Sequence, residues 1–205
     1  MRSKTIPISN GQRTHNVVEV PLKTNVPVDT SPKVEILPLV AEDHELITTK
    51  LDEFNFDKDD AEKLEDSLIN CMDFYRGLGL SANQIGINAR AFAMVHEEQP
   101  MVMFNPKLVS VTDEKYLAKE GCLTWFGLYP KVLRPQGVTI NWKDKEGQEF
   151  SGSFIDLSAR IILHEYDHLN GYTFFDRAKP MHMSQAKKRR KIYIRKAKRQ
   201  AKEIA

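Results

Sequence analysis

Apolar residues recur at helical spacing in the stretch 57–76. The positions that follow one another at intervals of three and four are Ala61, Leu64, Leu68, Cys71 and Met72. This spacing puts them on one face, so it predicts an amphipathic helix of about four to five turns. Cys71 falls on the apolar face and is expected to be a small buried hydrophobe rather than a reactive thiol.

A second helical pattern lies between residues 156 and 171. Its apolar positions, again near helical spacing, are Leu157, Ile161, Ile162 and Leu169. Asp156 or Ser158 can cap the start of this helix. Gly171 can adopt the left-handed conformation that ends many helices.

Strand patterns occupy much of the remaining chain. The runs 91–95 and 101–106 predict two strands joined by a polar loop, in which His96 is expected to be a solvated surface residue. Residues 107–112 are expected to continue the second strand.

A further strand pair is predicted by the runs 138–142 and 149–155, which read as a hairpin around Glu146-Gly147. The fold class expected from these elements is α+β. Mostly antiparallel strands would pack around a central helix carrying the HExxH motif described below, with a basic helix at the C-terminus.

The positions of prolines and of basic residues indicate where this domain begins and ends. Pro7, Pro21 and Pro27 interrupt the first thirty residues, so residues 1–30 are expected to form an extended segment that wraps over the body or moves. One domain is expected over residues 31–180. A basic helical tail would follow over residues 181–205.

Length, composition and cysteine content indicate the number of domains and the cellular compartment. The chain has 205 residues, 41% of them hydrophobic, which suits one domain with a substantial core. Its two cysteines lie in unrelated contexts, so we expect a reducing compartment and no disulfide framework. No apolar run approaches membrane-spanning length, and the first twenty residues lack the apolar core of a signal peptide.

The near-neutral net charge conceals a strong asymmetry. Residues 187–205 hold ten Lys or Arg and one Glu, a net of +9, while the rest holds 20 Lys or Arg and 27 Asp or Glu, a net of −7. The tail is either a solvated, fraying helix or a phosphate-binding surface.

The sequence HEYDHLNG over residues 164–171 contains an H-E-x-x-H motif. On a helix, His164 and His168 lie on one face and can reach a single metal ion. Glu165 stands beside the first histidine, where its carboxylate can take a proton from a water on that metal. An ordinary half-exposed helix could carry the same residues, so a third ligand is needed to decide.

Cys122 can supply that third ligand. Alone, a cysteine between Gly121 and Leu123 is more simply a buried hydrophobe. With His164 and His168 it completes a Cys/His/His set, and three protein ligands leave a fourth position open, as in catalytic rather than structural sites.

Three short motifs occur in order along the chain: GLGLSANQ at residues 77–84, EGCLT at residues 120–124 and HEYDHLNG at residues 164–171. Together they resemble the signature motifs of peptide deformylase, which removes the N-formyl group from nascent formyl-methionyl chains. The resemblance spans roughly residues 30–178.

The resemblance implies a role for each matching residue. Cys122, His164 and His168 would hold the metal, and Glu165 would be the general acid and base. Gln84 and the backbone N–H of Leu123 would stabilise the oxyanion. The residues expected to contact substrate are Leu78, Gly79 and Ile161. Leu163, Thr124 and Trp125-Phe126 depart from the usual family residues, which bears on substrate preference and rate more than on reaction class.

The chemistry implied is hydrolysis of the formyl amide, releasing formate and a free N-terminus. A thiolate with two imidazoles suits Fe²⁺ or Zn²⁺. The resemblance favours Fe²⁺ as the native metal, with Zn²⁺, Ni²⁺ or Co²⁺ possible in purified protein. The implied partners are the nascent formyl-Met polypeptide and the ribosome, bound through the basic residues of 187–202. The chain is expected to be a monomer that does not bind a membrane. Its expected location is the cytoplasm of a bacterium or phage-infected host, or alternatively an organelle.

Two other function classes compete with this interpretation. A zinc peptidase shares H-E-x-x-H, but its third ligand lies downstream. The spacing of one such class needs a histidine where Phe174 stands, and the only later glutamate is Glu203. A pure nucleic-acid binder would explain the tail and leave the Cys/His/His set without a purpose.

Overall fold

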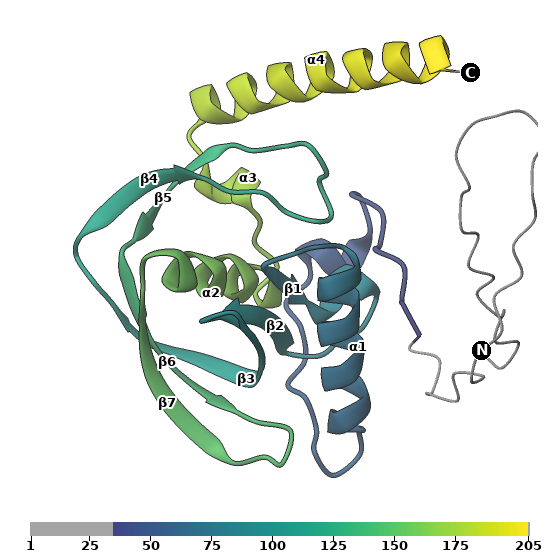
Figure 1. Ribbon diagram of the computed structural model, residues 1–205. Helices are drawn as coiled ribbons and strands as arrows, with labels where there is room; N and C mark the ends of the chain where they lie inside the picture. The colour runs from purple at the N-terminus through teal and green to yellow at the C-terminus, as the bar shows by residue number, and fades with distance from the viewer. Residues whose placement is uncertain (1–34, 205) are drawn as a thin grey trace, which may run out of the picture. The chain divides into compact units, whose positions relative to one another are not determined.

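The computed structural model describes residues 35–204, with side-chain environments for residues 35–200 (Figure 1). The segment expected over residues 1–30 lies outside the described residues. The described part is α+β with antiparallel sheets and a C-terminal helix, which agrees with the predicted class.

A five-stranded antiparallel sheet forms the larger layer, in the order β1-β2-β3-β6-β7. Its strands are β1 (Gly79–Ser81), β2 (Ala91–His96), β3 (Gln99–Val111), β6 (Gly137–Lys143) and β7 (Glu149–Ile155). Both predicted strand pairs are confirmed. The continuation over residues 107–112 is also confirmed, because β3 is one long strand that pairs first with β2 and then with β6.

A two-stranded sheet was not foreseen from the sequence. It consists of β4 (Lys115–Lys119) and β5 (Lys131–Pro135), paired antiparallel. Exposed and covered residues alternate along both strands, and in β5 the buried positions are Val132 and Arg134. Both strands have only five residues, and a buried arginine, Arg134, interrupts the apolar pattern of β5, so the hydrophobic pattern alone did not reveal them.

The first long helix, α1 (Ala61–Phe74), begins later than predicted. Asp60 caps it, because its carboxylate accepts a hydrogen bond from the Lys63 N–H, and residues 57–60 therefore precede the helix. Its buried side chains are Leu64, Leu68, Cys71 and Met72, so the predicted apolar face and the buried Cys71 are confirmed.

The helix α2 (Asp156–Leu169) carries the HExxH motif. The predicted cap is wrong: the N-cap is Ile155 without a side-chain cap, and Asp156 instead accepts a hydrogen bond from Gln136 Nε2. Gly171 has a φ of 74°, as predicted for a residue just past a helix end. Ten residues of α2 are buried, so the helix is covered on most of its circumference.

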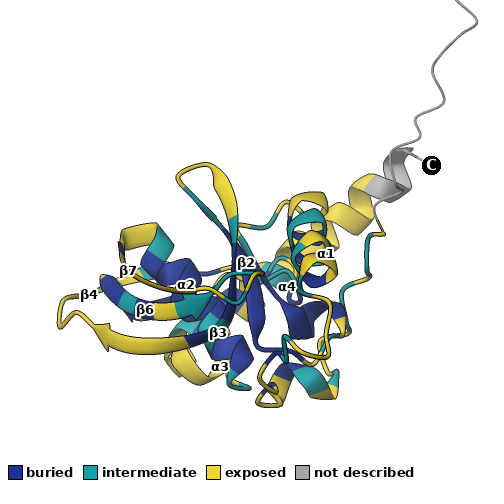
Figure 2. Cartoon of the chain, turned by 90° about the horizontal axis from the view of Figure 1, so that it is seen from below, coloured by how far each residue is buried: buried dark blue, intermediate teal, exposed yellow. Residues whose placement is uncertain are grey.

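Two further helices close the fold. They are α3 (Phe174–Arg177) and α4 (Pro180–Ile204). The described part of the chain also contains two short 3-10 helices, η1 (Glu45–Thr48) and η2 (Ala82–Ile85). Met183 and Ala186 of α4 are buried in a cluster with Trp125, whereas the last described turns of the helix are exposed (Figure 2). No helix within the described residues is both long and apolar enough to span a membrane.

His96 differs from its expectation. It is half-buried, its ring meets Phe154 edge-on at 5.1 Å between centroids, and its Nδ1 lies 3.0 Å from Ser158 Oγ. The tight turn between β2 and β3 places His96 over the start of α2. The prediction of a polar loop at this point could not show that contact.

Candidate metal centre

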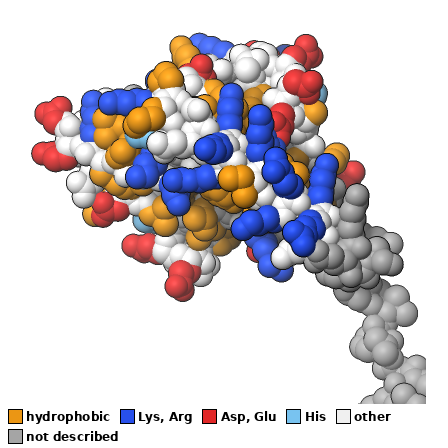
Figure 3. All heavy atoms as spheres, turned by 90° about the horizontal axis from the view of Figure 1, so that it is seen from above, with side chains coloured by type: hydrophobic (Ala, Val, Ile, Leu, Met, Phe, Trp, Pro, Cys, Tyr) orange, Lys and Arg blue, Asp and Glu red, His pale blue; other side chains and the backbone are white. Residues whose placement is uncertain are grey.

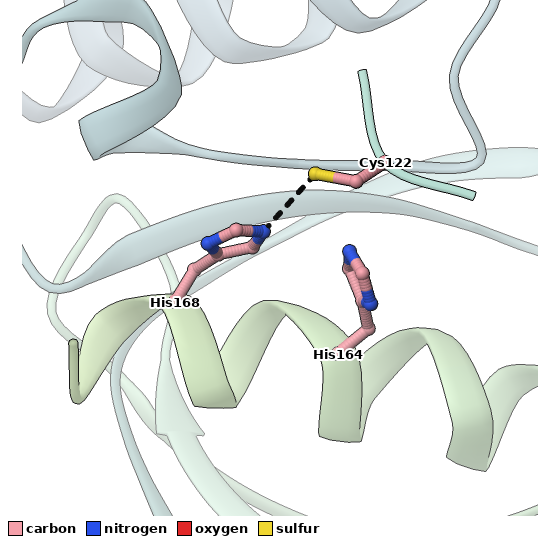
Figure 4. Close-up of side chains that lie close together, drawn as sticks. All are labelled: Cys122, His164 and His168. Atoms are coloured by element: carbon pink, nitrogen blue, oxygen red, sulfur yellow. Dashed lines mark hydrogen bonds between the residues drawn. The ribbon is translucent and has the colours of Figure 1, made fainter. Parts of the chain in front are cut away.

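Three side chains from two separate parts of the chain meet in the interior (Figure 4). The Cys122 thiol, His164 and His168 each offer a ligand atom, and these atoms all lie within 4.8 Å of one another. Cys122 Sγ is 3.3 Å from His168 Nε2. One turn of α2 separates the two histidines, as the spacing of four predicted.

The donor set fits a metal ion. His164 Nε2 is buried and has no hydrogen-bond partner among the described residues. A buried polar atom without a partner is costly, and here it faces a thiol and a second imidazole. Thiolate and imidazole donors are those preferred by zinc and iron, so a divalent cation would satisfy all three at once.

Glu120 orients His164 from the far side of its ring. Glu120 Oε2 lies 3.1 Å from His164 Nδ1, which leaves Nε2 pointing toward the other donors. Arg134 donates to Glu120 through Nε at 2.9 Å, and Arg160 Nη1 donates at 2.6 Å. Burial alone would raise the pKa of Glu120, but the hydrogen bonds from His164 and Arg134 outweigh it and hold that pKa at about 2.

The two histidines are electrostatically different. Burial favours neutral His164, but the nearby Cys122 and the hydrogen bond with Glu120 raise its pKa well above the usual value. Burial and repulsion from His164 lower the pKa of His168 well below the usual value. The environment therefore stabilises one positive charge at this point, which a bound cation would supply in place of a proton.

Gln84 is held rigidly beside the cysteine. Its Oε1 accepts a hydrogen bond from the Ser81 N–H at 3.0 Å, which fixes the amide orientation. Its Nε2 then lies 3.3 Å from Cys122 Sγ and 3.1 Å from Thr124 Oγ1. Gln84 is 1% exposed, so this amide presents N–H groups inside the site rather than to bulk water.

Glu165 lies against the glycine strand β1. A Cβ added to Gly79 would come within 2.5 Å of Glu165 Oε1 and 2.9 Å of Ile161 Cγ2, so only glycine fits there. Burial raises the pKa of Glu165 to about 7. Its Oε2 is buried without a partner among the described residues. A carboxyl with such a pKa can exchange a proton near neutrality.

The remaining sequence-predicted residues form the edge of the site. Leu123 is half-buried, and its side chain would meet a Cβ added to Gly77 at 2.8 Å. Within the described part of the chain, no group accepts a hydrogen bond from the Leu123 N–H. Leu78 is 52% exposed next to Gly79. The fold therefore brings the predicted site residues into one region, with Leu78 on its outer lip.

Comparison with known proteins accounts for this geometry. A family model described as polypeptide deformylase matches residues 36–184, which include every residue of the site. The chain belongs to the peptide deformylase family. This agrees with the resemblance seen in the three motifs.

Relatives within the peptide deformylase family cover the chain to different extents. It is 42% identical to the peptide deformylase of Pseudothermotoga lettingae over 49% of this chain and 58% of that protein, and 35% identical to that of Bartonella quintana over 69% and 80%. The alignment thus spans less than two thirds of the first relative. A crystal structure of a peptide deformylase from Legionella pneumophila superimposes with a TM-score of 0.71 at 28% identity, covering 80% of this chain and 99% of that one.

Sequence reasoning missed several residues that shape the site. Glu120 lies in the second motif, but no role was predicted for it. A carboxylate two residues from the candidate ligand Cys122 is a signal for a partner of a ligand histidine. Arg134 and Asp167 belong to the same buried network, with 2.5 Å between Arg134 Nη1 and Asp167 Oδ2. Trp125, which was seen only as a departure, stacks on His168 with the ring planes 8° apart.

Proposed function

We propose that this chain is a metal-dependent hydrolase that removes the N-formyl group from the N-terminal formylmethionine of nascent polypeptides, releasing formate. The observation that carries the proposal is the convergence of Cys122, His164 and His168 within 4.8 Å beside the buried Glu165. Family membership supports the reaction class. In this proposal α2 is the central helix of the catalytic domain, which comprises residues 31–180.

The proposed cofactor is one divalent metal ion held by Cys122, His164 and His168. When bound, it would polarise the formyl oxygen and lower the pKa of the attacking water toward neutrality. Three protein ligands would leave the fourth position of a tetrahedral ion for water or substrate. We propose Fe²⁺ as the native metal, with Zn²⁺, Ni²⁺ or Co²⁺ as substitutes in purified protein.

Glu165 is proposed to move the proton in both halves of the reaction. It accepts a proton from water as the water oxygen adds to the formyl carbon. It then delivers that proton to the amine nitrogen as the carbon–nitrogen bond breaks, so that formate and a free amine leave. The raised pKa of Glu165 suits both roles near neutral pH.

Gln84 and Leu123 are proposed to stabilise the negative charge that develops on the formyl oxygen. The Gln84 amide is fixed by the Ser81 N–H before any substrate arrives, and the Leu123 N–H has no partner among the described groups. Preorganised donors of this kind act without reorganisation when the charge appears.

Gly79, Leu78 and Ile161 are proposed to bind the substrate. β1 is the edge strand of the larger sheet, so one side of Gly79 has free backbone groups to which an extended peptide can add. Buried Ile161 would contribute an apolar wall for the methionine side chain, and the exposed Leu78 would cover the bound peptide.

The basic residues of 187–202 are proposed to dock the chain to the ribosome. Lysine and arginine side chains gather on the face over which α4 runs (Figure 3). Such a surface binds phosphate without reading sequence, and its affinity falls with salt. We further propose a monomer acting where nascent formyl-Met chains emerge, in a bacterial or phage-infected cytoplasm or in an organelle.

A peptidase is the alternative that the H-E-x-x-H motif itself raises. The test is product analysis with a short formyl-Met peptide and its unformylated counterpart, using protein prepared without air and loaded with Fe²⁺. The proposal predicts stoichiometric formate and an intact deformylated peptide, with the unformylated peptide left unchanged. Cleavage of internal peptide bonds without formate would assign the chain to a peptidase instead.

A further inference from the structure

A cavity lies beside α2. Its volume is about 540 Å³, within the range of roughly 300–1,000 Å³ found for small-molecule sites. It is bounded by β3, β5, α2 and the segment that follows α2. None of the three metal donors lines it.

The helix itself separates this cavity from the metal centre. Leu163, Tyr166 and Asn170 line the cavity and recur at intervals of three and four, so they share one face of α2. His164 and His168 share another face. At about 100° per residue the two faces are roughly opposite, so the cavity and the metal donors lie on different sides of one helix.

The opening of the cavity is apolar. Leu108, Leu133 and Tyr172 all line it and are 38%, 50% and 50% exposed. Large apolar side chains that gather at one opening, rather than being scattered singly, mark a surface that gains stability when covered. Tyr166 continues this wall into the cavity.

The charged groups of the cavity leave an excess of positive charge. Among the described residues, Asp167 is the one acidic group that lines it, and both Arg134 and Arg177 already bind it. Arg177 uses Nε and Nη2 on that carboxylate, and no described group accepts from its Nη1. Lys50 lines the same cavity, and its ammonium has no acidic partner among residues 35–200.

We propose that this cavity binds a small monocarboxylate with an apolar body. The carboxylate would lie between Lys50 and the free edge of the Arg177 guanidinium, a group whose planar N–H donors match a carboxylate. The apolar body would cover Leu108, Leu133 and Tyr172. This site does not depend on the function proposed above.

Binding can be tested by titrating octanoate into the full-length, metal-loaded protein and following it by calorimetry and heteronuclear NMR. The proposal predicts saturable binding of one octanoate per chain, with shifts confined to the lining residues. Leu108→Glu and Lys50→Glu should each weaken the affinity at least about tenfold, since each removes one of the two recognised features. Neutral octanamide should bind at least about tenfold more weakly than octanoate.

Matched controls separate this site from general charge or apolar effects. Val109 is 57% exposed beside Leu108 but does not line the cavity, and Lys115 is an exposed lysine elsewhere. Val109→Glu and Lys115→Glu should leave octanoate affinity unchanged. Equal losses in the control and test variants would overturn the proposal.

Two further outcomes would also overturn it. Displacement of octanoate by a Met-containing product peptide would place the carboxylate in the substrate groove instead. Self-association that Leu108→Glu abolishes, without any octanoate binding, would assign the apolar opening to contact between copies of the chain. The Glu165→Gln variant should bind octanoate with unchanged affinity, because Glu165 does not line the cavity.

Discussion

His164 is positioned through one nitrogen of its ring and presents the other to Cys122 and His168. Glu120 engages Nδ1, and the partnerless Nε2 faces Cys122 and His168. The charge on Glu120 is secured by Arg134 and Arg160, so it persists far below neutral pH. A carboxylate in this position fixes the histidine tautomer and makes the other nitrogen a better metal ligand.

Replacing Glu120 by Gln therefore should weaken metal binding. The neutral amide keeps the shape but loses the charge, and we expect metal affinity to fall by roughly 10–100-fold. Chelator competition with the purified protein measures this directly. Glu114→Gln, in an exposed turn, is the matched control and should bind metal like the parent. Unchanged metal affinity in Glu120→Gln would show that Glu120 does not position His164.

Gln84 is predicted to act on turnover rather than on substrate binding. Gln84→Leu removes the N–H donor while keeping a similar volume, and kcat/KM for formate release should fall about 10²–10³-fold, chiefly in kcat. Metal content measured alongside should stay near one ion per chain. Gln148→Leu, at an exposed position, serves as control. A change in KM alone would contradict the oxyanion role.

The convergence of Cys122, His164 and His168 was predictable, because coordination chemistry dictates the residue types and spacing of a metal site. The supporting residues were not. Arg134 and Asp167 are distant in sequence, and nothing in the local pattern of either one indicates that they meet at 2.5 Å. Such pairs become visible only when β5 packs against α2.

Among the elements, β5 and α2 are joined by that buried ion network. Arg134 on β5 binds Glu120 and Asp167, and its side chain is 6% exposed. Both carboxylates have given up water for these contacts, so their stability depends on the arginine remaining charged and in place. The network thus couples the small sheet to the helix that carries His164 and His168.

Arg134→Met should consequently destabilise the fold strongly. It leaves two carboxylates buried with fewer partners, and we expect the free energy of unfolding to drop by about 3–5 kcal/mol. Urea denaturation of the metal-free protein isolates this effect from metal binding. Lys131→Met, at an exposed position of the same strand, should change stability little. A loss below about 1 kcal/mol would show that the network is not the link described.

The long elements followed from periodicity, while their ends depended on side-chain contacts. The helix over residues 57–76 was predicted too long because Asp60 caps it at Ala61. The cap expected from Asp156 failed because that carboxylate binds Gln136 instead. The β4–β5 pair was missed because both strands are short and the burial of Arg134 depends on tertiary contacts that no local pattern contains.

For the molecule as a whole, α4 is both part of the core and the source of the charge asymmetry. Met183 and Ala186 are buried, Arg190 pairs with Glu42, and Tyr193 meets Phe126 at 6.2 Å between ring centroids. Beyond these contacts the helix continues with basic residues. A basic tail was predictable from composition, but its packing against the body was not.

Removing residues 195–205 should leave the catalytic body intact. This deletes five Lys or Arg and one Glu but keeps the contacts made by Met183, Ala186 and Tyr193. Deformylation of short formyl-Met peptides should be unchanged. Ribosome binding should weaken, and its salt slope should fall by up to about 0.7–0.9 for each cation lost. Equal binding by the truncated and full-length proteins across salt concentrations would contradict the docking proposal.

The most direct test of deformylation through Glu165 combines metal content with formate release in Glu165→Gln. Protein is loaded with Fe²⁺ without air, and bound iron and kcat/KM on a short formyl-Met peptide are measured for both forms. We expect one iron per chain in each, with kcat/KM reduced by about 10²–10⁴ in the variant because the proposed proton carrier is gone. Parent-like formate release by an iron-loaded Glu165→Gln protein would contradict this expectation.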